Sequence, residues 1–414
     1  MNPPTRPKVL LATTSRWFAS ARLAMAFDMA GCAVDMVCPS GHPFALITGR
    51  GHIYPYRGLA PLGSFQSAID ASQPDIVVPC DDLACRHLHD LYVRALKDGK
   101  DGKLCMLVER SLGDPSQYAL INARSQLIAL AYELLIDAPQ TEMISSVEEL
   151  RVWIAQFGLP VALKTDGSSG GLGVRIADSE AEAVRAFGVL NAPPKLARAV
   201  KRAVFDQDRS LLTPCLQRRR PAVSVQRFLP FHDATIAVAC WRGEVVASIC
   251  VEVVRTWKPK GPASVVRLID NPDMLLAAQK LTSHLKLSGL CGFDFLVDRV
   301  TGKAHLIEMN PRATQTCHLP LGTAHDLPAA LAACIAGKPI PNSTSVTERN
   351  VIALFPLEWQ NDPASPFLRS GYHDVPWEEP KLVQACVESR MRNGGWLTYE
   401  NLDRMLARLP WRRT

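Results

Sequence analysis

Three oxygen-bearing side chains lie close together in the sequence GFDFLVDRVTGKAHLIEMNPR, which spans Gly292–Arg312. The segment predicts two strands joined by a tight turn at 298–303. Strand side chains alternate between two faces, so Glu308 and Asn310 share a face, and Asp294 falls opposite Glu308 to within about one residue. Oxygen ligands of this kind suit Mg²⁺, which also offsets the repulsion between two carboxylates. The sequence favours a magnesium site over the alternative, a polar outer face of a hairpin.

A second candidate site lies upstream, where a predicted strand, Pro160–Lys164, enters a glycine-rich loop, Asp166–Gly173, and continues as Val174–Ile176. Glycines let backbone amides approach an anion, serine hydroxyls add donors, and Lys164 supplies a cation for phosphate oxygens. The loop residues concerned are Gly167, Ser168, Ser169, Gly170, Gly171 and Gly173. The loop is not a Walker loop, because no GxxxxGK[ST] occurs. The alternative to phosphate binding is a mobile glycine-rich hairpin with a chance lysine. The downstream metal hairpin makes nucleotide binding the better interpretation.

The elements before this loop must position a substrate. Strand and helix signals alternate over residues 8–120, which predicts a parallel sheet with helices on both faces. The predicted strands are Val9–Ala12, Ala33–Cys38 and Asp75–Pro79, and the first helix is Trp17–Ala30. Ligands of such sheets bind beyond the carboxyl ends of strands. Thr13–Arg16 and Cys80–Asp82 are therefore candidate substrate loops, with plain connecting loops as the alternative.

The rest of the chain alternates helices and strands less regularly. Ser146 and Glu149 form a capping box that opens a helix at Val147–Phe157. The other predicted helices are Ala123–Ile136 and 273–287, and the other strands are Val223–Leu229, Thr235–Trp241 and Val245–Val254. A PNSTS segment near residue 341 marks a linker. Beyond it we expect a small tail module with one apolar helix face formed by Leu402, Met405, Leu406 and Leu409.

Composition narrows the class of protein. The chain has 414 residues, 47% hydrophobic and 21% charged, as in ordinary globular proteins, and two to three domains are expected. The net charge of +6 is no nucleic-acid signature. Its 12 cysteines form no CxxC pair, which argues against zinc and disulfides and for a reducing compartment. No signal peptide or membrane span is expected, so the predicted location is cytoplasmic.

The order of these features (strand, Lys164, glycine loop, Val225–Leu229, then GFDFLVD and IEMNPR) resembles the ATP-grasp superfamily. The synthetase halves of the carbamoyl phosphate synthetase large subunit and stand-alone carboxylate–amine ligases are the most similar, over roughly residues 75–340. The resemblance implies an α/β (α+β ATP-grasp) fold in consecutive parts. These are a preATP-grasp βαβ domain at 1–120, an ATP-grasp domain at 121–340 with a lid at about 139–225 and a metal subdomain at about 226–340, and a tail module at 341–414.

The resemblance also implies how ATP is held. Lys164 contacts the α- and β-phosphates, and the loop Gly167–Gly173 closes over them. The adenine is lined through main-chain contacts by Gln226, Arg227, Phe228 and Leu229. Asp233 stands seven residues after Gln226, where the family places an acid on the ribose hydroxyls. Two positions depart from the family pattern: Arg124 stands where a lysine is usual, and Gln226 stands where an acid is common.

The magnesium ligands implied by the resemblance are Asp294, Glu308 and Asn310, with Mn²⁺ as a substitute ion. The first of them varies between acid and amide among related enzymes. Arg312 matches the arginine that steadies the transferred phosphate or an acyl phosphate, a role that its fixed fork suits. Arg312 and Lys164 are thus the expected catalytic residues.

The expected activity is an ATP-dependent, ADP-forming ligation that makes a C–N bond. A substrate carboxylate attacks the γ-phosphate, and an amine, ammonia or another nucleophile then displaces phosphate. The alternatives are an ATP-grasp phosphotransferase and a nucleotide-binding regulatory protein without turnover. The expected partners are small molecules, neither a membrane nor a nucleic acid, and a homo-oligomer is left open.

Two further features have alternative interpretations. Nine Lys and Arg occur between Lys195 and Arg227, but Phe205 is the one aromatic residue among them, so a solvated helix face is favoured over nucleic-acid binding. Arg218–Arg220 could instead face an acidic substrate. His318, shortly after Arg312, either lines the acceptor pocket or is a structural histidine.

Overall fold

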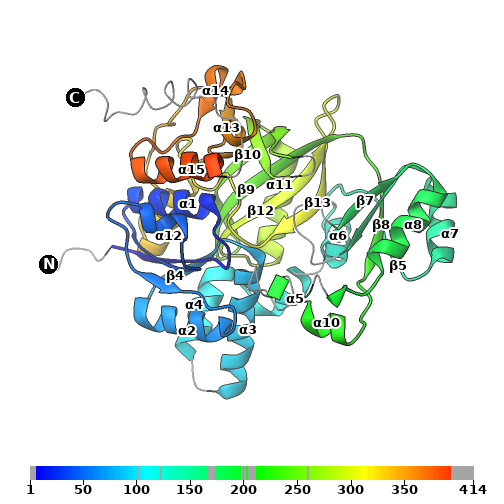
Figure 1. The fold of residues 1–414 in the computed structure, drawn as a ribbon, viewed down its shortest axis with the longest axis horizontal. Helices are drawn as coiled ribbons and strands as arrows, with labels where there is room; N and C mark the ends of the chain where they lie inside the picture. The colour runs from blue at the N-terminus through cyan, green and yellow to red at the C-terminus, as the bar shows by residue number, and fades with distance from the viewer. Residues whose placement is uncertain are drawn as a thin grey trace.

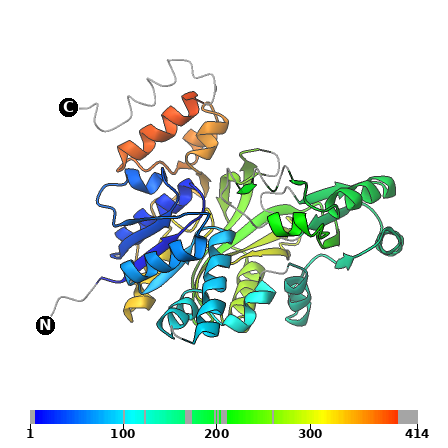
Figure 2. The same cartoon turned by 60° about the horizontal axis from the view of Figure 1, so that its bottom comes forward.

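Three β-sheets organise the molecule, which is a computed structural model. Figure 1 shows the N-terminal sheet in blue, a large central sheet in green and yellow, and a smaller sheet projecting at the right; Figure 2 shows the same arrangement turned. The residues that the structure describes are 6–99, 102–121, 124–165, 173–196, 199, 202–203, 211–258 and 261–392. The predicted helix around residues 402–409 lies outside them.

The N-terminal sheet is parallel, with the strand order β3-β2-β1-β4. Its strands are β1 (Lys8–Ala12), β2 (Ala33–Cys38), β3 (Ile53–Pro55) and β4 (Ile76–Pro79). The helices of this part are α1 (Phe18–Met29), α2 (Pro61–Ser72), α3 (Asp82–Asp98), α4 (Gly102–Leu112) and α5 (Tyr118–Ile121), with short 3₁₀ turns at Pro43–Leu46 and Pro115–Gln117. Alternate residues of β1 are buried on opposite faces, Leu10 with α2 and α3 and Leu11 with α1. The predicted parallel βαβ domain is confirmed.

The central sheet has seven strands in the order β13-β12-β9-β10-β11-β14-β15 and is antiparallel except between β14 and β15. Its first five strands along the chain are β9 (His232–Trp241), β10 (Glu244–Thr256), β11 (Ala263–Leu268), β12 (Gly289–Val297) and β13 (Ala304–Asn310). It packs against α6 (Arg124–Glu133), α11 (Pro272–His284) and α12 (Leu327–Ala336). Ile236 and Val238 share a core with α11, whereas Ala237 and Ala239 share another with α12.

The same two cores contain the buried residues of the N-terminal sheet. Leu10 belongs to the cluster that includes Phe293 and Leu281, and Leu11 belongs to the cluster that includes Ala237 and Leu327. The N-terminal and central sheets are therefore packed as one continuous body around the hairpin β12–β13.

The smaller sheet, which we call the lid, has the order β5-β8-β6-β7 and a core of its own. Its elements are β5 (Thr141–Ile144), α7 (Val147–Phe157), β6 (Val161–Thr165), β7 (Val174–Ala177), α8 (Glu180–Leu190), α10 (Leu212–Leu216) and β8 (Val223–Arg227). Ser146 caps α7 by accepting from the backbone N–H of Glu149, as predicted. The Glu149 carboxylate accepts from Ser145 rather than closing the box on Ser146.

The segment after residue 341 adds strands to the central sheet. It comprises β14 (Val351–Ala353), α13 (Leu357–Asn361), α14 (Phe367–Ser370), β15 (Tyr372–His373) and α15 (Pro380–Arg392). β14 pairs antiparallel with β11, and α15 lies against the 3₁₀ turn that follows β2. This segment also reaches the N-terminal sheet domain, because the backbone N–H and hydroxyl of Thr48 donate to the carboxylate of Glu379.

One helix ends earlier in the structure than the sequence predicted. The apolar pattern suggested Ala123–Ile136, but α6 ends at Glu133 and Leu135 takes a left-handed φ of 54° with an exposed side chain. An apolar run continues past the helix end because Ile136 enters the core shared by the two large sheets. No helix among the residues described is long and apolar enough to cross a membrane.

Candidate active site

The hairpin β12–β13 has the predicted register. Asp294 lies opposite Glu308, and Gly292 lies opposite Asn310. The Nδ2 atom of Asn310 donates to Oδ2 of Asp294 at 3.0 Å. The two carboxylates and the amide therefore meet at one place, as the sequence indicated.

A β-bulge determines which way Glu308 points. The pairing passes from Asp294–Glu308 directly to Phe295–Leu306, so Ile307 has no partner on β12. Without this extra residue, Leu306 and Glu308 would share a face. With it, Leu306 packs beside Phe295 in the core while Glu308 stays with Asp294. The bulge thus turns the face that carries the candidate metal ligands away from the core, a common role of bulges beside functional sites.

Burial makes the paired carboxylates electrostatically costly. Burial, followed by the charge of Glu308, raises the pKa of Asp294 to about 6, although hydrogen bonds from Thr235 and Asn310 oppose this rise. Two carboxylates this close repel unless a cation or a proton lies between them. Their oxygens and that of Asn310 form a donor set that Mg²⁺ prefers. The residues present therefore fit a magnesium ion.

Arg312 connects this hairpin to the N-terminal sheet domain. Its Nη2 donates to Oδ1 of Asn310 at 3.1 Å, and its Nε donates to Oδ1 of Asp82, the first residue of α3, at 2.7 Å. The carboxylates around it raise the pKa of the guanidinium against the opposing effect of burial. The next residue, Ala313, donates its N–H to the carbonyl of Pro79 at the end of β4. The expected catalytic arginine therefore lies between the metal ligands and the candidate substrate loops.

The two candidate substrate loops lie side by side. The carboxylate of Asp81 accepts from the hydroxyl of Thr13 at 2.8 Å, from the hydroxyl of Thr14 at 2.9 Å and from the backbone N–H of Thr14 at 2.6 Å. The same carboxylate caps α3 by accepting from the N–H of Ala84. Asp81 therefore holds the loop after β1 against the loop after β4, at the carboxyl edge where such sheets bind ligands.

The lid brings Lys164 toward the central sheet. Lys164 lies on β6 and is 9% exposed. Burial raises the pKa of Asp233, at the start of β9, and the positive charge of Lys164 opposes that rise. The two residues predicted to bind phosphate and ribose are thus near enough to interact. Of the predicted phosphate loop, the carbonyl of Gly173 accepts a hydrogen bond from the N–H of Thr165, whereas residues 166–172 lie outside the described part of the chain.

The strand expected to line the adenine connects the lid to the central sheet. Gln226 is buried on β8, and its Nε2 donates to the hydroxyl of Thr141 at 2.8 Å. The backbone N–H of Arg227 donates to Gln140, and that of Phe228 donates to Pro160. These donors already have partners within the lid. Arg124 begins α6, but its side chain lies outside the described part.

Several site contacts escaped the sequence argument. Thr235, which hydrogen-bonds Asp294, was not assigned a role. Asp82 was placed in a candidate substrate loop, but its ion pair with Arg312 was not predicted. Thr235 lies two residues after Asp233 on β9, so the two side chains share one face of the strand. This period was the available signal that Thr235 belongs to the site. His318 proves to be buried, and its Nε2 forms a hydrogen bond of 2.6 Å with Oδ2 of Asp374.

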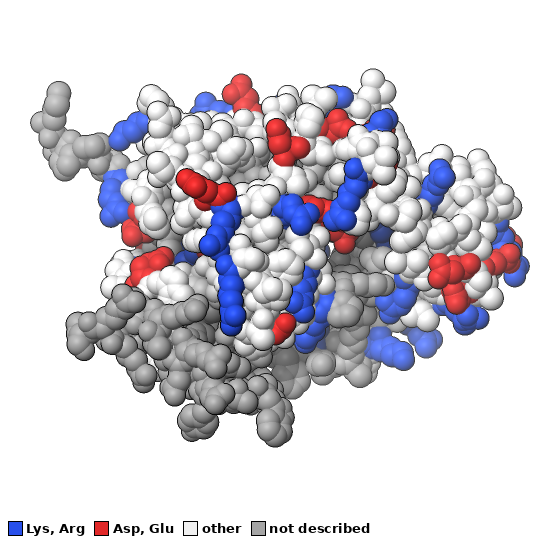
Figure 3. All heavy atoms as spheres, turned by 90° about the horizontal axis from the view of Figure 1, so that it is seen from above, with Lys and Arg blue, Asp and Glu red and all other residues white. Residues whose placement is uncertain are grey.

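Figure 3 shows basic side chains interspersed with acidic ones over the drawn face.

A parallel sheet domain followed by two antiparallel sheets, with candidate metal ligands on a hairpin of the larger one, is the arrangement of the ATP-grasp fold. Residues 124–323 match the family model "Carbamoyl-phosphate synthase L chain, ATP binding domain". The carbamoyl phosphate synthase large chain of Pseudothermotoga lettingae is 24% identical over 309 residues, 70% of this chain and 25% of that protein. The chain therefore spans about a quarter of that relative's length.

Solved structures show the same fold. N5-carboxyaminoimidazole synthase from Aspergillus clavatus, in complex with ADP and 5-aminoimidazole ribonucleotide, superposes with a TM-score of 0.59 at 14% identity, covering 83% of this chain and 80% of that one. The biotin carboxylase domain of Hydrogenobacter thermophilus 2-oxoglutarate carboxylase, in complex with MgADP and bicarbonate, gives 0.58 at 15%, covering 81% and 71%. The chain thus has an ATP-grasp fold, and its residues 124–323 are similar to the ATP-binding domain of carbamoyl-phosphate synthase.

Proposed function

We propose that the protein is an ADP-forming ligase that joins a small-molecule carboxylate to an amine or ammonia through an acyl phosphate. The observation that carries this proposal is the position of Arg312, which contacts the metal ligand Asn310 on one side and Asp82 on the other. A substrate held by the N-terminal loops would therefore lie next to the phosphate-binding centre.

ATP is proposed to bind between the lid and the central sheet. Lys164 would contact the α- and β-phosphates beneath the loop 167–173, and Asp233 would bind the ribose. Residues 226–229 would line the adenine, and Arg124 would take the place of the usual phosphate-binding lysine. The proximity of Lys164 to Asp233 supports this arrangement because it brings the phosphate and ribose contacts into one cleft.

Mg²⁺, or Mn²⁺ in its place, held by Asp294, Glu308 and Asn310 would neutralise charge on the phosphate oxygens. Arg312 would exchange its contact with Asp82 for the oxygens of the transferred phosphoryl group. A carboxylate oxygen of the substrate then forms a bond to the γ-phosphorus, and ADP leaves. In the second step the nucleophile attacks the carbonyl carbon, phosphate leaves with the electrons of the C–O bond, and the nitrogen loses a proton.

The fold comparisons support this proposal at the level of the class. Both solved relatives carry ADP, one with magnesium and bicarbonate. The free thiols of all twelve cysteines agree with a reducing compartment, and we propose a cytoplasmic enzyme. The two alternatives from the sequence are a phosphotransferase and a nucleotide-binding regulatory protein without turnover. Both are possible outcomes of the test below.

The test is to follow the fate of the carboxylate oxygen. With ¹⁸O in the carboxyl group of a turned-over acid, label should appear in the released phosphate, because the attacking oxygen leaves with phosphorus. Hydroxylamine should trap the intermediate as a hydroxamate, with ADP formed in proportion. AMP and pyrophosphate would indicate an adenylate, a stable phosphorylated product a kinase, and nucleotide binding without hydrolysis a regulatory protein. Each of these three results contradicts the ligase.

A further inference from the structure

A cavity of about 440 Å³ lies beside the first turns of α1. Its walls come from three parts of the chain: the N-terminal sheet domain, the loop after β13, and the segment after residue 341. The volume is in the range of small-molecule sites. We propose that this cavity, called here the α1 cavity, holds the acid substrate of the proposed ligase, and that this acid is a monocarboxylate with an aromatic or branched apolar body.

The wall of the α1 cavity is mostly apolar. Its large apolar side chains are Trp17 and Phe18 at the start of α1, Leu46 in the 3₁₀ turn after β2, Leu354, Phe355 and Leu357 after β14, and Leu382 on α15. Aromatic and aliphatic walls of this kind exclude water from the body of a ligand, and a few polar groups orient it. The wall therefore selects an apolar body rather than a bare inorganic anion.

The charge of the wall selects an anion. Arg16 and Arg22 line the cavity, and none of the described lining residues is Asp or Glu. The charge of Arg22 is balanced by ion pairs with Asp374 and Glu378, so Arg16 carries the charge that is left for a ligand. Arg16 donates its Nε to the carbonyl of Ser40 at 2.6 Å and forms no ion pair with another described residue. This bond orients the guanidinium and leaves its two terminal nitrogens for a bidentate contact to a carboxylate.

A buried network of hydrogen bonds and ion pairs stabilises one wall of the α1 cavity. The carboxylate of Asp374 pairs with Nη2 of Arg22 at 2.5 Å and with Nε2 of His318 at 2.6 Å. Arg22 and His318 are 8% and 6% exposed. Nε of Arg22 and Nδ1 of His318 have no hydrogen-bond partner among the described residues, so the wall keeps unused hydrogen-bonding capacity.

Two segments of the chain connect the lining of the α1 cavity to the proposed reaction centre. Arg16 directly follows the loop Thr13–Ser15 that Asp81 holds. On the other side, Thr314 packs so closely on Gly292 that a Cβ there would lie 2.5 Å from Cγ2 of Thr314, and the next residue, Gln315, lines the cavity. An acid bound here would therefore lie beside residues that directly follow the substrate loop after β1 and the residue packed on the hairpin β12–β13.

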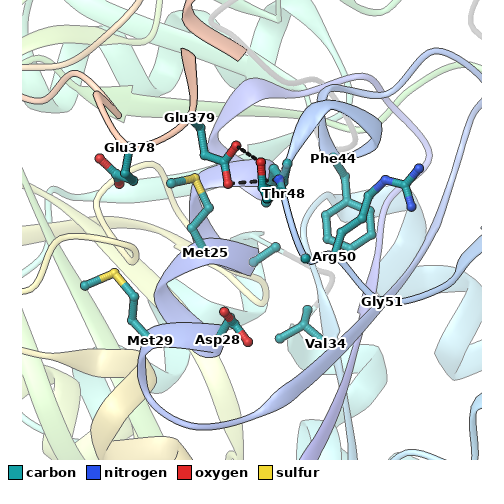
Figure 4. Close-up of a pocket in the computed structure, with 13 residues that line it drawn as sticks. Met25, Asp28, Met29, Val34, Phe44, Thr48, Arg50, Gly51, Glu378 and Glu379 are labelled. Carbon is teal, nitrogen blue, oxygen red and sulfur yellow. Dashed lines mark hydrogen bonds between the residues drawn. The ribbon is translucent and has the colours of Figure 1, made fainter. Parts of the chain in front are cut away.

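A second cavity on the same helix gives the contrast. It has a volume of about 130 Å³ and is lined by Asp28, Glu378 and Glu379 beside Arg50 (Figure 4). Figure 4 shows Glu379 turned to Thr48, whose backbone and hydroxyl it binds. This smaller, acidic cavity suits neither the size nor the charge of an apolar acid, so it provides matched control positions.

The test is direct binding of probe molecules to the full chain by calorimetry, with and without a non-hydrolysable ATP analogue. Phenylacetate should bind, while its neutral isostere phenylacetamide, the cation 2-phenylethylamine and the small anion acetate should each bind at least about tenfold more weakly. Absence of phenylacetate binding at low millimolar concentration, or tighter binding of 2-phenylethylamine, would overturn the inference.

Two variants locate the binding. Arg16→Gln should weaken phenylacetate about ten- to a hundredfold without changing phenylacetamide, whereas Arg50→Gln, whose Nε also donates to a backbone carbonyl, should change neither. Ala385→Phe, which fills the α1 cavity, should weaken phenylacetate more than acetate, and Lys381→Phe on the exposed side of α15 should not. Phenylacetate binding that is indifferent to both Arg16→Gln and Ala385→Phe contradicts the assignment.

The inference rests on the proposed function, but the two can fail separately. If acids form hydroxamates in the presence of hydroxylamine and the preference among them is unchanged in Ala385→Phe, the cavity assignment is wrong and the ligase stands. If phenylacetate binds as described but no acid yields a hydroxamate with ADP, the cavity assignment stands and the ligase mechanism is wrong.

Discussion

The lid and the central sheet of this molecule are packed in different ways. The central sheet shares both of its cores with the N-terminal sheet, through residues such as Phe293 and Ala237. The lid has a separate core, built from residues between Ile144 and Val225. No buried lid residue in the described part belongs to the shared cores.

This difference separates two tasks. The proposed metal ligands need fixed positions, and a hairpin in the middle of a shared core supplies them, since any shift would disturb two sheets at once. The proposed phosphate loop would have to admit and release a nucleotide, and a lid with its own core can change position as a unit without opening the main body. Variants in the two sheets should therefore differ in what they affect.

Glu308→Gln should have the largest effect. It removes one of the two charges that balance the ion while the amide preserves the shape of the side chain, so Mg²⁺-dependent turnover should fall about a hundred- to a thousandfold. The melting temperature without magnesium should not fall. Steady-state kinetics and thermal melting measure both, with Glu348→Gln at an exposed position as the control. Wild-type turnover with an unchanged melting curve would refute the metal assignment.

Lys164→Ala should weaken ATP about ten- to a hundredfold, because a charge-assisted contact to phosphate contributes about 1.5–3 kcal/mol. Adenosine, which has no phosphate, should bind almost as before. Calorimetric titration with both ligands tests this, and Arg185→Ala on the exposed face of α8 controls for loss of positive charge in the lid. An equal loss for ATP and adenosine would mean that Lys164 supports the lid structure instead.

Asp294→Asn should stabilise the ligand-free protein while abolishing its magnesium dependence. The folded state raises the pKa of Asp294 to about 6, above its ordinary value of 3.8, so the folded protein holds this proton more tightly than the unfolded chain. The contribution of the group to stability is then present below pH 4 and is lost as the pH rises to about 6. The variant should gain about 1–2 kcal/mol at pH 7–8 and little at pH 4.

Denaturant unfolding at pH 4, 6 and 8 without metal measures this difference. The sign of the change in stability at pH 8 is the informative result. If Asp294 also stabilised the ligand-free fold, its replacement would lower the stability at pH 8. Wild-type affinity for Mg²⁺ should in turn weaken as the pH falls through 6, since the ion and the proton compete for the same carboxylate.

The local parts of the site were predictable, and the distant contacts were not. The register of Asp294 against Glu308 follows from one short turn, so strand alternation sufficed. The bulge at Ile307 depends on how β13 meets its neighbour, which no period in the sequence reports. Arg312 pairs with Asp82 across 230 residues, and Arg22 pairs with Asp374 across 352. Such pairs arise from the packing of whole sheets, so the walls of the α1 cavity could not be assembled beforehand.

Loss of a helix cap should have the smallest effect and should remain within one sheet. Ser146→Ala removes the hydrogen bond to the N–H of Glu149 at the start of α7, which costs about 0.5–2 kcal/mol. Because the lid core is separate, amide hydrogen exchange should quicken in α7 and in the lid strands but not in β9 or β12. ATP affinity should fall by no more than a few-fold, as a small fraction of lids becomes locally unfolded.

Asn271→Ala supplies the matched test in the other sheet. Asn271 caps α11 by accepting from the N–H of Met274 and also donates to the carbonyl of Gly302. Since α11 packs in the core shared with the N-terminal sheet, the destabilisation should appear as faster exchange in both large sheets and as a lower global melting temperature. If the two variants instead give the same pattern of exchange, the lid unfolds together with the main body, and its separate core does not make it an independent unit.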